Sequence, residues 1–393
     1  MRAIKDSVHD YIEVDGVAEA LLDTRPVQRL RHIKQLSTVR LVYPSANHTR
    51  FEHSLGVYHL ADRALDHLDV TGARADTVRA AALLHDIGHG PYGHQTEGII
   101  QRRLGRHHDD VDRLLSNGVV GDVLSDHGLD PERVADLVAG EGRLGQLVAG
   151  ELDVDRMDYL VRDAHHTGVP YGTIDHGRLL RALTFRDDDL VLAEGNVATA
   201  ESVLVGRALM NSAVYRHHVS RIAGAMLDRA GARLLDATDL DIETFARMTD
   251  AELLAALRDC EATRDAARRV RDRDLYKRAV WTERDAVPDD VATADYEAAR
   301  DFEADIADTA GVPEHAVVVD TPGEPSMPES SVRVAVNGDT RRLDEQSPLV
   351  EGMLASQRVQ WRFGVYAPEE HVPEVAAAAE RELGLADVGD PAE

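Results

Sequence analysis

The stretch ALLHDIGHGPYGH, residues 82–94, ends an apolar run that begins at Val78 and is typical of a buried helix. It then places three histidines and one aspartate within thirteen residues, among glycines and a proline. Polar groups on a buried surface cost free energy unless something pairs with them. These side chains therefore either satisfy one another or hold a ligand that is not protein.

Two other stretches carry ionisable side chains on apolar helix faces. In RFEHSLGVYHLADRAL, His53 shares a helical stripe with apolar residues four, seven and eleven positions later. In ELDVDRMDYLVRD, Asp155 shares a face with Leu152. His85 lies on the apolar face of its own helix, and Asp86 follows it directly. Two imidazoles and two carboxylates suit one divalent metal ion that keeps positions open for water or phosphate. Mn, Fe, Co, Ni or Mg fits this set better than a structural zinc.

A purely structural interpretation competes with the metal site. A lone buried histidine usually has a hydrogen-bond partner within the protein. Tyr159 and Tyr215, at helical spacing, are compatible with simple core packing, and His165-His166 with a helix end. The metal site is favoured because inward-facing histidines and aspartates recur on separate helices, next to a Gly-His-Gly-Pro turn.

Length and cysteine content limit the class of protein. The chain has 393 residues, enough for one large helical domain with an appendage or for two to three ordinary domains. Cys260 is the only cysteine, which excludes an intrachain disulfide and a cysteine-based metal site. The N-terminus has no apolar signal-peptide core, and no window approaches the length of a membrane span. We therefore expect a soluble, cytoplasmic protein without a membrane partner.

The charge is strongly acidic. The chain has 71 Asp and Glu against 44 Lys and Arg, with a net charge of −27, and its only lysines are Lys5, Lys34 and Lys277. This balance is typical of a halophilic protein, because high salt screens a crowded acidic surface. It also disfavours nucleic acid as a partner, since binding along a phosphate backbone needs basic patches.

The sequence pattern predicts a mostly α fold. Helices are expected over residues 50–69, 76–87 (with Asp76 as N-cap), 94–104, 151–166 and 197–235, and a hairpin over 183–196. After about residue 310, HAVVVD, SVRVAVNGDTRRL and WRFGVYAPEE read as strands, with Asn337-Gly338 as a hairpin turn, and EVAAAAERELG as a closing helix. We expect a helical core over 1–245, whose motif region covers about 50–165. A helical extension is expected over 246–305 and a small α+β C-terminal lobe over 306–393.

RFEHSLG, HDIGHGPYGH and DVDRMDYLVRDAHHTG occur in this order and spacing. In these stretches the sequence resembles the HD-domain phosphohydrolases, and among them the deoxynucleoside triphosphate triphosphohydrolases (dNTPases). The resemblance covers about residues 4–281, and DEQSPLV and WRFGVYAPEE in the tail are also similar. It implies an HD-domain helical core that hydrolyses a dNTP with one divalent metal ion.

The resemblance also implies a role for each matching residue. The implied metal ligands are His53, His85, Asp86 and Asp155. The implied substrate-binding residues are Gln35, Leu36, Arg50, His89, Tyr159, Asp163, Arg207 and Tyr215, with Tyr215 as the sugar gate. The implied catalytic residues are His94, His108 and Glu97, with His107 as an alternative to His108. Glu97 stands where the family has Asp. Imidazole titrates near neutral pH, so His94 or His108 can protonate the departing 5′ oxygen.

The family often has a regulatory nucleotide site. The matching residues are Asp23, Gln28, Arg31, Arg273 and Lys277, while Arg2 and Lys5 stand where the family's activator site has different residues. The resemblance therefore implies an activating nucleotide, GTP or a dNTP. It also implies a homo-oligomer, either a dimer or a tetramer.

The expected function is metal-dependent hydrolysis of dNTPs to a deoxynucleoside and inorganic triphosphate. One alternative is another enzyme on the same scaffold, such as a deoxynucleoside monophosphate phosphatase or an alarmone hydrolase. The extended match around Tyr159, Arg207 and Tyr215 disfavours it. A second alternative is a nucleotide-regulated protein that binds nucleic acid without turnover. The presence of all four metal ligands and the acidic composition disfavour that reading.

Overall fold

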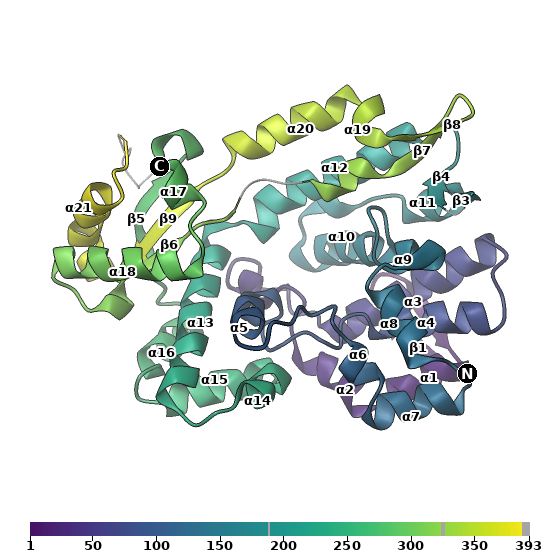
Figure 1. The fold of residues 1–393 in the computed structure, drawn as a ribbon, viewed down its shortest axis with the longest axis horizontal. Coiled ribbons are helices and arrows are strands. Elements are labelled where there is room, and N and C mark those ends of the chain that lie inside the picture. The colour runs from purple at the N-terminus through teal and green to yellow at the C-terminus, as the bar shows by residue number, and fades with distance from the viewer. Residues whose placement is uncertain (188, 324–326, 387–393) are drawn as a thin grey trace. The chain divides into compact units, whose positions relative to one another are not determined.

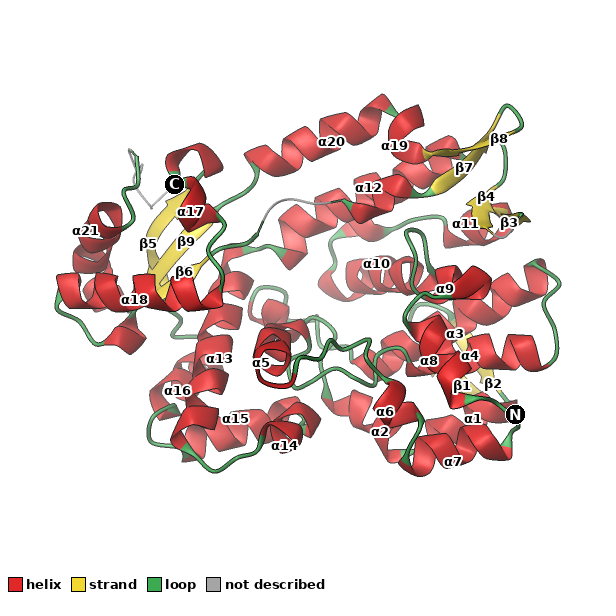
Figure 2. Ribbon diagram, in the orientation of Figure 1, coloured by secondary structure: helices red, strands yellow, loops and turns green. Residues whose placement is uncertain are grey.

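The structure is a computed structural model that describes residues 1–187, 189–323 and 327–386. The chain forms two compact units. The first comprises Met1–Tyr215, Asp239–Ala255 and Pro328–Glu351, and the second comprises Arg216–Thr238, Ala256–Met327 and Gly352–Glu393 as far as these are described. Figure 1 follows the chain by colour, and Figure 2 shows that helices dominate and strands form small sheets. The mostly α fold predicted from the sequence is confirmed.

Three helices of the first unit position the predicted metal ligands. Helices α3 (Arg50–His67) and α4 (Ala73–Leu84) pack against each other, and α10 (Val154–Thr167) packs against α3. His53 lies in α3, Asp155 lies in α10, and His85 and Asp86 directly follow α4. Each helix buries its apolar face, since Leu60, Val78 and Leu160 are fully buried. The other helices of this unit are α1 (Gly16–Leu22), α2 (Arg25–Arg29), α5 (His94–Leu104), α6 (Asp112–Leu115), α7 (Gly118–Asp126), α8 (Pro131–Val138), α9 (Gly142–Val148), α11 (His176–Ala182), α12 (Val197–Met210), α14 (Ile242–Arg247) and α19 (Leu343–Gln346).

The first unit also contains two small sheets. Strands β1 (Arg2–Asp6) and β2 (Asp10–Val14) form an antiparallel hairpin. The second sheet has the order β3-β4-β7-β8 and pairs β4 with β7 in parallel. Its strands are β3 (Leu183–Arg186), β4 (Asp189–Leu192), β7 (Arg333–Val336) and β8 (Asp339–Arg342). The turn between β7 and β8 has positive φ at both Asn337 and Gly338, as a type I′ turn requires.

The second unit is built on a three-stranded antiparallel sheet. Its order is β5-β9-β6, with β5 (Lys277–Thr282), β9 (Phe363–Ala367) and β6 (Val318–Asp320). Trp361, Phe363 and Val365 form its buried core with Ile306. The helices of this unit are α13 (His218–Ala237), α16 (Arg264–Asp272), α17 (Asp289–Ala292), α18 (Tyr296–Ala310) and α21 (Val372–Glu382). Within α15 (Asp250–Asp259) and α20 (Pro348–Val359) the chain passes from the first unit to the second.

Most predicted elements are confirmed, and the exceptions have physical reasons. Helix α5 begins and ends as expected, and the two hairpins, the late strands and the closing helix α21 are present. Helix α4 begins at Ala73 rather than after Asp76, because Gly72 adopts a positive φ of 68° and forms its N-cap. Residues 197–235 do not form one helix. Helix α12 ends at Met210 and is followed by a π-helical turn, Asn211–Tyr215, before α13 begins.

The remaining exceptions are strands. β1 and β2 lie within the region expected to form a helical core, and β5 lies in the region expected to form a helical extension. The backbone of β5 pairs with β9, more than eighty residues later in the chain, and such a partner is invisible to local periodicity. No helix in the described ranges is long and apolar enough to cross a membrane.

Candidate active site

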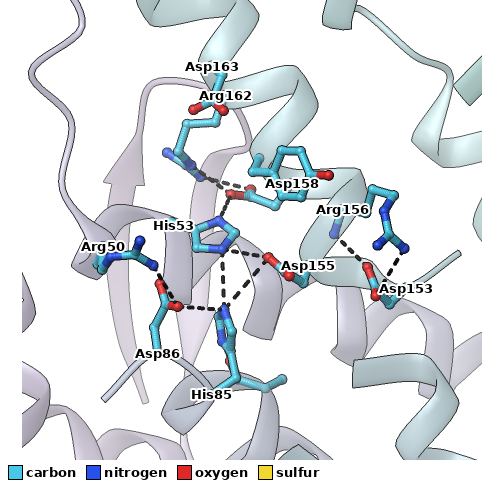
Figure 3. A network of polar contacts seen from close by, with 12 residues as sticks. Arg50, His53, His85, Asp86, Asp153, Asp155, Arg156, Asp158, Arg162 and Asp163 are labelled. Carbon is cyan, nitrogen blue, oxygen red and sulfur yellow. Dashed lines mark hydrogen bonds and ion pairs between the residues drawn. The ribbon is translucent and has the colours of Figure 1, made fainter. Parts of the chain in front are cut away.

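His53, His85 and Asp86 converge where α3 packs against the end of α4. All three residues are buried, and each places a ligand-type atom within 4.8 Å of the others. His85 Nε2 lies 3.2 Å from His53 Nε2 and 3.5 Å from Asp86 Oδ1. Figure 3 shows the two imidazoles pointing toward each other beside the carboxylate. Three of the four predicted metal ligands therefore form one cluster.

The fourth predicted ligand, Asp155, comes from the first turn of α10. Its Oδ1 lies 2.8 Å from His53 Nε2 and 3.8 Å from His85 Nε2. Asp153 caps this helix by accepting a hydrogen bond from the backbone N–H of Arg156, which fixes where the first turn begins. The structure thus brings together all four residues from the three helices expected.

The donor atoms of this cluster fit a divalent metal ion. Asp86 Oδ2 is buried and has no hydrogen-bond partner within the described part of the chain. The Nε2 atoms of His53 and His85 face the same space, and imidazole nitrogens and carboxylate oxygens together suit divalent transition metals. The orphaned Asp86 oxygen is the observation that points to an ion rather than to a self-satisfied polar core.

The local charges keep the carboxylates ionised. Burial raises the pKa of Asp86, but Arg50, His85 and His89 outweigh burial and hold it well below the usual range. Arg50 Nη1 donates to Asp86 Oδ1 at 2.8 Å. Burial lowers the pKa of His53, but the hydrogen-bonded carboxylates Asp155 and Asp158 raise it to about 10. Without a metal ion, both ring nitrogens of His53 therefore carry a proton at neutral pH, and a metal ion must displace one of these protons.

Three further histidines form a cluster beside the ligands. The His89 and His108 rings stack at 3.9 Å between centroids, and the His94 ring meets His89 edge-on at 4.7 Å. Glu97 Oε2 lies 2.8 Å from His94 Nδ1, and Glu97 Oε1 contacts His108 Nδ1. The longer glutamate, at the position where the family has Asp, therefore bridges two histidines.

These histidines differ in their protonation. Burial lowers the pKa of His108, but Asp109 and Glu97 outweigh burial and raise it to about 9. Burial and the nearby Arg50 hold the pKa of His89 well below its usual range, despite the contact with Asp86. At neutral pH the cluster thus contains a protonated imidazole stacked on a neutral one.

One cavity of about 110 Å³ connects the two clusters. It is lined by Gln35, Arg50, His53, His85, Asp86, His89, His94, His108, Asp109, Val138, Val148, Ala149, Asp155 and Tyr159. His108 lines it, whereas the alternative His107 does not and has a half-exposed side chain. Gln35 Oε1 and Arg50 Nε are buried without a hydrogen-bond partner in the described ranges, and a ligand would satisfy such groups.

A second set of predicted residues continues from Tyr159. Arg207 Nε donates to the Tyr159 hydroxyl at 3.0 Å, and the Tyr215 hydroxyl donates to Asp163 Oδ2 at 2.8 Å. The two tyrosine rings meet edge-to-face at 6.2 Å. Asp163, Arg207 and Tyr215 do not line the cavity themselves, and neither does the half-buried Leu36. Tyr159 therefore joins the cavity lined by the predicted metal ligands to the expected sugar-binding residues.

Three of the five predicted regulatory residues lie in the first unit. Both carboxylate oxygens of Asp23 accept from Arg2, at 2.9 and 2.8 Å. Gln28 Oε1 accepts from Arg31 Nε at 2.9 Å, and the Arg31 guanidinium lies 3.5 Å above the Phe51 ring. Gln28 and Arg31 are thus side by side, while Asp23 has a partner of its own.

The other two predicted regulatory residues, Arg273 and Lys277, lie in the second unit. They line a pocket of about 330 Å³ together with His218, Tyr276 and Arg278. Several cationic side chains around one pocket favour an anionic ligand.

Sequence reasoning missed several groups that support the site. Asp109 lines the cavity, and its Oδ1 lies 3.0 Å from His108 Nε2. Asp158 contacts the inner side of His53, and His48 Nε2 lies 2.8 Å from Asp163 Oδ1. One signal was available for Asp158, because it follows Asp155 by one helical turn on the same face of α10.

Comparisons with known proteins identify the family of the chain. The HD domain family matches residues 50–163, and the HD associated region matches residues 174–392. An uncharacterized protein of Methanocaldococcus jannaschii is 34% identical in an alignment that covers 95% of this chain and 81% of that protein. An uncharacterized protein of Bacillus subtilis is 31% identical in an alignment that covers 98% of this chain and 97% of that protein. The deoxynucleoside triphosphate triphosphohydrolase SAMHD1 homolog of Dictyostelium discoideum is 30% identical in an alignment that covers 70% of this chain and 59% of that protein.

Solved structures show the same fold over nearly the whole chain. A hypothetical protein from Aquifex aeolicus matches with a TM-score of 0.77 and 29% identity, covering 96% of this chain and 99% of that one. A phosphohydrolase from Bacteroides thetaiotaomicron matches with a TM-score of 0.74 and 25% identity, covering 94% of this chain and 100% of that one. The chain, with its HD domain and the associated region that follows, belongs to the HD-domain phosphohydrolases.

Proposed function

We propose that this phosphohydrolase cleaves dNTPs to a deoxynucleoside and inorganic triphosphate, with one divalent metal ion held by His53, His85, Asp86 and Asp155. The observation that carries the proposal is the shared cavity, in which this donor set lies beside Arg50 and three histidines. A polyanion bound next to a metal ion is what such a lining accommodates. The names of the SAMHD1 relatives, which are dNTP triphosphohydrolases, favour a triphosphate substrate.

In the proposed reaction, water adds to the α-phosphorus and the bond to the 5′ oxygen breaks. A divalent ion, when bound, polarises the phosphate and lowers the pKa of a nearby water. Arg50 offsets charge on the phosphates and keeps Asp86 ionised. His89, which is buried and neutral, contributes a hydrogen bond rather than a charge.

The proton for the departing 5′ oxygen comes from His94 or His108. His108 is protonated at neutral pH because its pKa is about 9. Glu97 contacts both imidazoles and can hold either of them in position for the transfer. The proton moves to the 5′ oxygen, and the products are a neutral deoxynucleoside and free triphosphate.

Sugar recognition is assigned to the residues that continue from Tyr159. Asp163, fixed by the Tyr215 hydroxyl and by His48, accepts a hydrogen bond from the 3′-hydroxyl. The Tyr215 ring forms the wall next to C2′. Gln35, whose Oε1 is buried and unpaired within the described residues, meets the sugar from the side of the cavity, and Leu36 packs against it.

Regulation by a nucleotide is part of the proposal. In the first unit, Gln28 and Arg31, with Asp23 nearby in sequence, are proposed to recognise a guanine base. In the second unit, the cationic pocket at Arg273 and Lys277 is proposed to bind phosphates. Initial rates with a single dNTP, with and without GTP, test this; equal rates in Arg31→Ala and wild type under both conditions would contradict it. The assembly proposed with this site is a dimer or tetramer.

One observation favours a second candidate function. The cavity of about 110 Å³ is well below the roughly 300 Å³ at which pockets for drug-sized ligands begin. A metal ion with a single phosphate fits this volume, so a deoxynucleoside monophosphate phosphatase is the second candidate.

Product identity separates the two candidates. The purified protein is incubated in high salt with Mn²⁺ or Mg²⁺ and each dNTP, then with each deoxynucleoside monophosphate. Free triphosphate from dNTPs supports the proposed function. Orthophosphate from monophosphates, with dNTPs left intact, supports the second candidate instead.

A further inference from the structure

His53 is engaged at both ring nitrogens, on opposite sides. Its Nε2 faces the other predicted metal ligands, at 2.8 Å from Asp155 Oδ1 and 3.2 Å from His85 Nε2. Its Nδ1 faces away from them and lies 2.8 Å from Asp158 Oδ2. Figure 3 shows the ring held between these two sides. A carboxylate behind an imidazole ligand decides which ring nitrogen carries the proton.

Asp158 is fully buried and is surrounded by donors. Arg162 donates to Oδ2 through Nε at 2.8 Å and to Oδ1 through Nη2 at 3.1 Å. His9 Nε2 lies 2.7 Å from Oδ1. An ionised carboxylate accepts only, so all three side chains can be satisfied at once when Asp158 is charged. These donors therefore stabilise the ionised Asp158, which offers a hydrogen-bond acceptor to Nδ1 of His53.

We propose that Asp158 is a positioning residue for the metal centre, and that His9 in turn holds Asp158 in position. The inference rests on the proposed metal site. To bind an ion through Nε2, His53 must carry its proton on Nδ1, and Asp158 is the acceptor placed to receive it. The same hydrogen bond fixes the rotation of the ring, so that the Nε2 lone pair points at the position shared by His85 and Asp155.

The hydrogen-bond network around Asp158 extends to the N-terminal hairpin. Arg162 also donates to Asp6 Oδ2 at 2.9 Å, and Asp6 Oδ1 accepts from the backbone N–H groups of Val8 and His9. Arg162 thus donates hydrogen bonds both to Asp158 and to Asp6, which stabilises the turn between β1 and β2. The N-terminal hairpin therefore reaches the metal ligand through His9, which no motif around His53 reveals.

The packing of α3 makes room for this arrangement. Gly56 lies one turn after His53, and a Cβ atom at this position would lie 1.8 Å from Asp158 Oδ1 and 2.5 Å from Arg162 Nη2. Only glycine leaves space for the carboxylate at this distance from α3. The close approach of α10 to α3 thus serves the contact between Asp158 and His53.

Metal affinity separates a positioning role from a merely structural one. Apo wild-type protein is titrated with Co²⁺, whose visible absorption reports its coordination, and compared with Asp158→Asn. Asparagine offers one acceptor oxygen to three donors, so Nδ1 of His53 loses its charged partner. We expect Co²⁺ affinity to fall by roughly 10–100-fold, the usual cost of losing such a partner, with an altered spectrum. Wild-type affinity in a folded Asp158→Asn protein overturns the inference.

Glu303→Gln is the matched control. Glu303 is a fully buried carboxylate in the second unit that accepts from Arg229 and from the backbone N–H of Val319, both at 2.9 Å. Its replacement removes the same charge from a comparable environment, and we expect a loss of stability with unchanged Co²⁺ affinity. An equal loss of affinity in this control would show that destabilisation alone weakens the metal site, and would overturn the inference.

His9 variants decide the outcome if Asp158→Asn does not fold. His9→Gln keeps a donor for Asp158, whereas His9→Leu removes it. We expect weaker Co²⁺ binding in the leucine variant and near wild-type binding in the glutamine variant. Equal Co²⁺ affinity of both variants overturns the role of His9 in positioning Asp158. No Co²⁺ binding by wild type removes the metal site and this inference together, whereas Co²⁺ binding without dNTP cleavage contradicts only the proposed function.

Discussion

His108 lies between two carboxylates, and this sets the pH range in which it holds a proton. Asp109 and Glu97 overcome the effect of burial and raise its pKa to about 9. If its protonated form is the active one, kcat is sustained at neutral pH and falls as pH rises through about 9. Glu97→Gln removes one of the groups that raise this pKa, so the alkaline limb should move to lower pH by on the order of one unit.

The measurement is the pH dependence of kcat for wild type and Glu97→Gln, at fixed saturating metal. His127→Gln is the control, because this exposed histidine at the end of α7 contacts the backbone carbonyl of Val123, does not line the cavity, and should leave the limb in place. An unmoved limb in Glu97→Gln would assign the proton to a different group.

Tyr215 tests sugar selection. An added hydroxyl by itself changes selectivity by only ~10²-fold, so stronger exclusion of ribonucleotides needs a rigid wall at C2′. Tyr215→Ala should narrow the gap in kcat/KM between dATP and ATP. Tyr215→Phe keeps the ring but loses the hydrogen bond to Asp163, so it should retain the gap with a higher KM. Equal loss on both nucleotides in Tyr215→Ala would mean that Tyr215 only packs.

The loop between α4 and α5 depends on a glycine beside Arg50. Gly93 has φ 54° and ψ −127°, a region that only glycine adopts readily, and a Cβ there would lie 2.6 Å from Arg50 Nη2. Gly93→Ala should cost about 1–3 kcal/mol of stability from backbone strain and displace the guanidinium from Asp86. We expect a loss of activity larger than the loss of folded protein.

Gly105→Ala is the matched control for this loop. Gly105 ends α5 with φ 64°, and among the described residues no neighbouring atom lies within 4 Å of a Cβ built at this position. It should cost about 1 kcal/mol through backbone conformation alone and leave turnover intact. Denaturant unfolding and turnover measured on both variants check the prediction. If both variants lose activity in proportion to their loss of stability, the contact between position 93 and Arg50 does not affect catalysis.

How far the sequence predicts these elements depends on the range of the interactions that form them. Helix α5 agrees with the helix predicted at about 94–104, because apolar periodicity and a glycine at the helix end are local signals. The break at Asn211–Tyr215 was missed, because apolar periodicity continues on both sides of a single π turn. Strand β5 was missed because its partner is distant in sequence.

The same distinction holds within the candidate site. The cluster of predicted metal ligands could be anticipated, because His53, His85 and Asp155 follow the apolar stripes of predicted helices and Asp86 follows His85 directly. The contact between His9 and Asp158 could not, because it joins the turn between β1 and β2 to α10 across about 150 residues. His108 could be chosen over His107 only once the loop after α5 was seen to turn one ring into the cavity.

At the scale of the whole molecule, the large negative charge determines how stability depends on salt. With a net charge of −27, repulsion opposes the folded state at low ionic strength. We predict that KCl stabilises the protein, because the Debye length falls from about 10 Å at 0.1 M to about 3 Å at 1 M. Each 1 kcal/mol gained should raise Tm by roughly 2–4 °C for a unit of this size. Thermal unfolding across this range of KCl checks it, and a Tm that falls with salt would contradict adaptation to high salt.

The most direct test of metal-dependent dNTP hydrolysis is the fate of heavy oxygen from labelled water. Wild type and His85→Ala are incubated with a dNTP in labelled water, and the nucleoside and phosphate products are analysed by mass spectrometry. Attack at the α-phosphorus predicts label in free triphosphate and none in the deoxynucleoside. It also predicts a rate lower by on the order of 10²-fold or more in His85→Ala, because a direct ligand should matter at least as much as its supporting partners. Label in orthophosphate, or a wild-type rate in a metal-free His85→Ala protein, would contradict the proposed chemistry at this site.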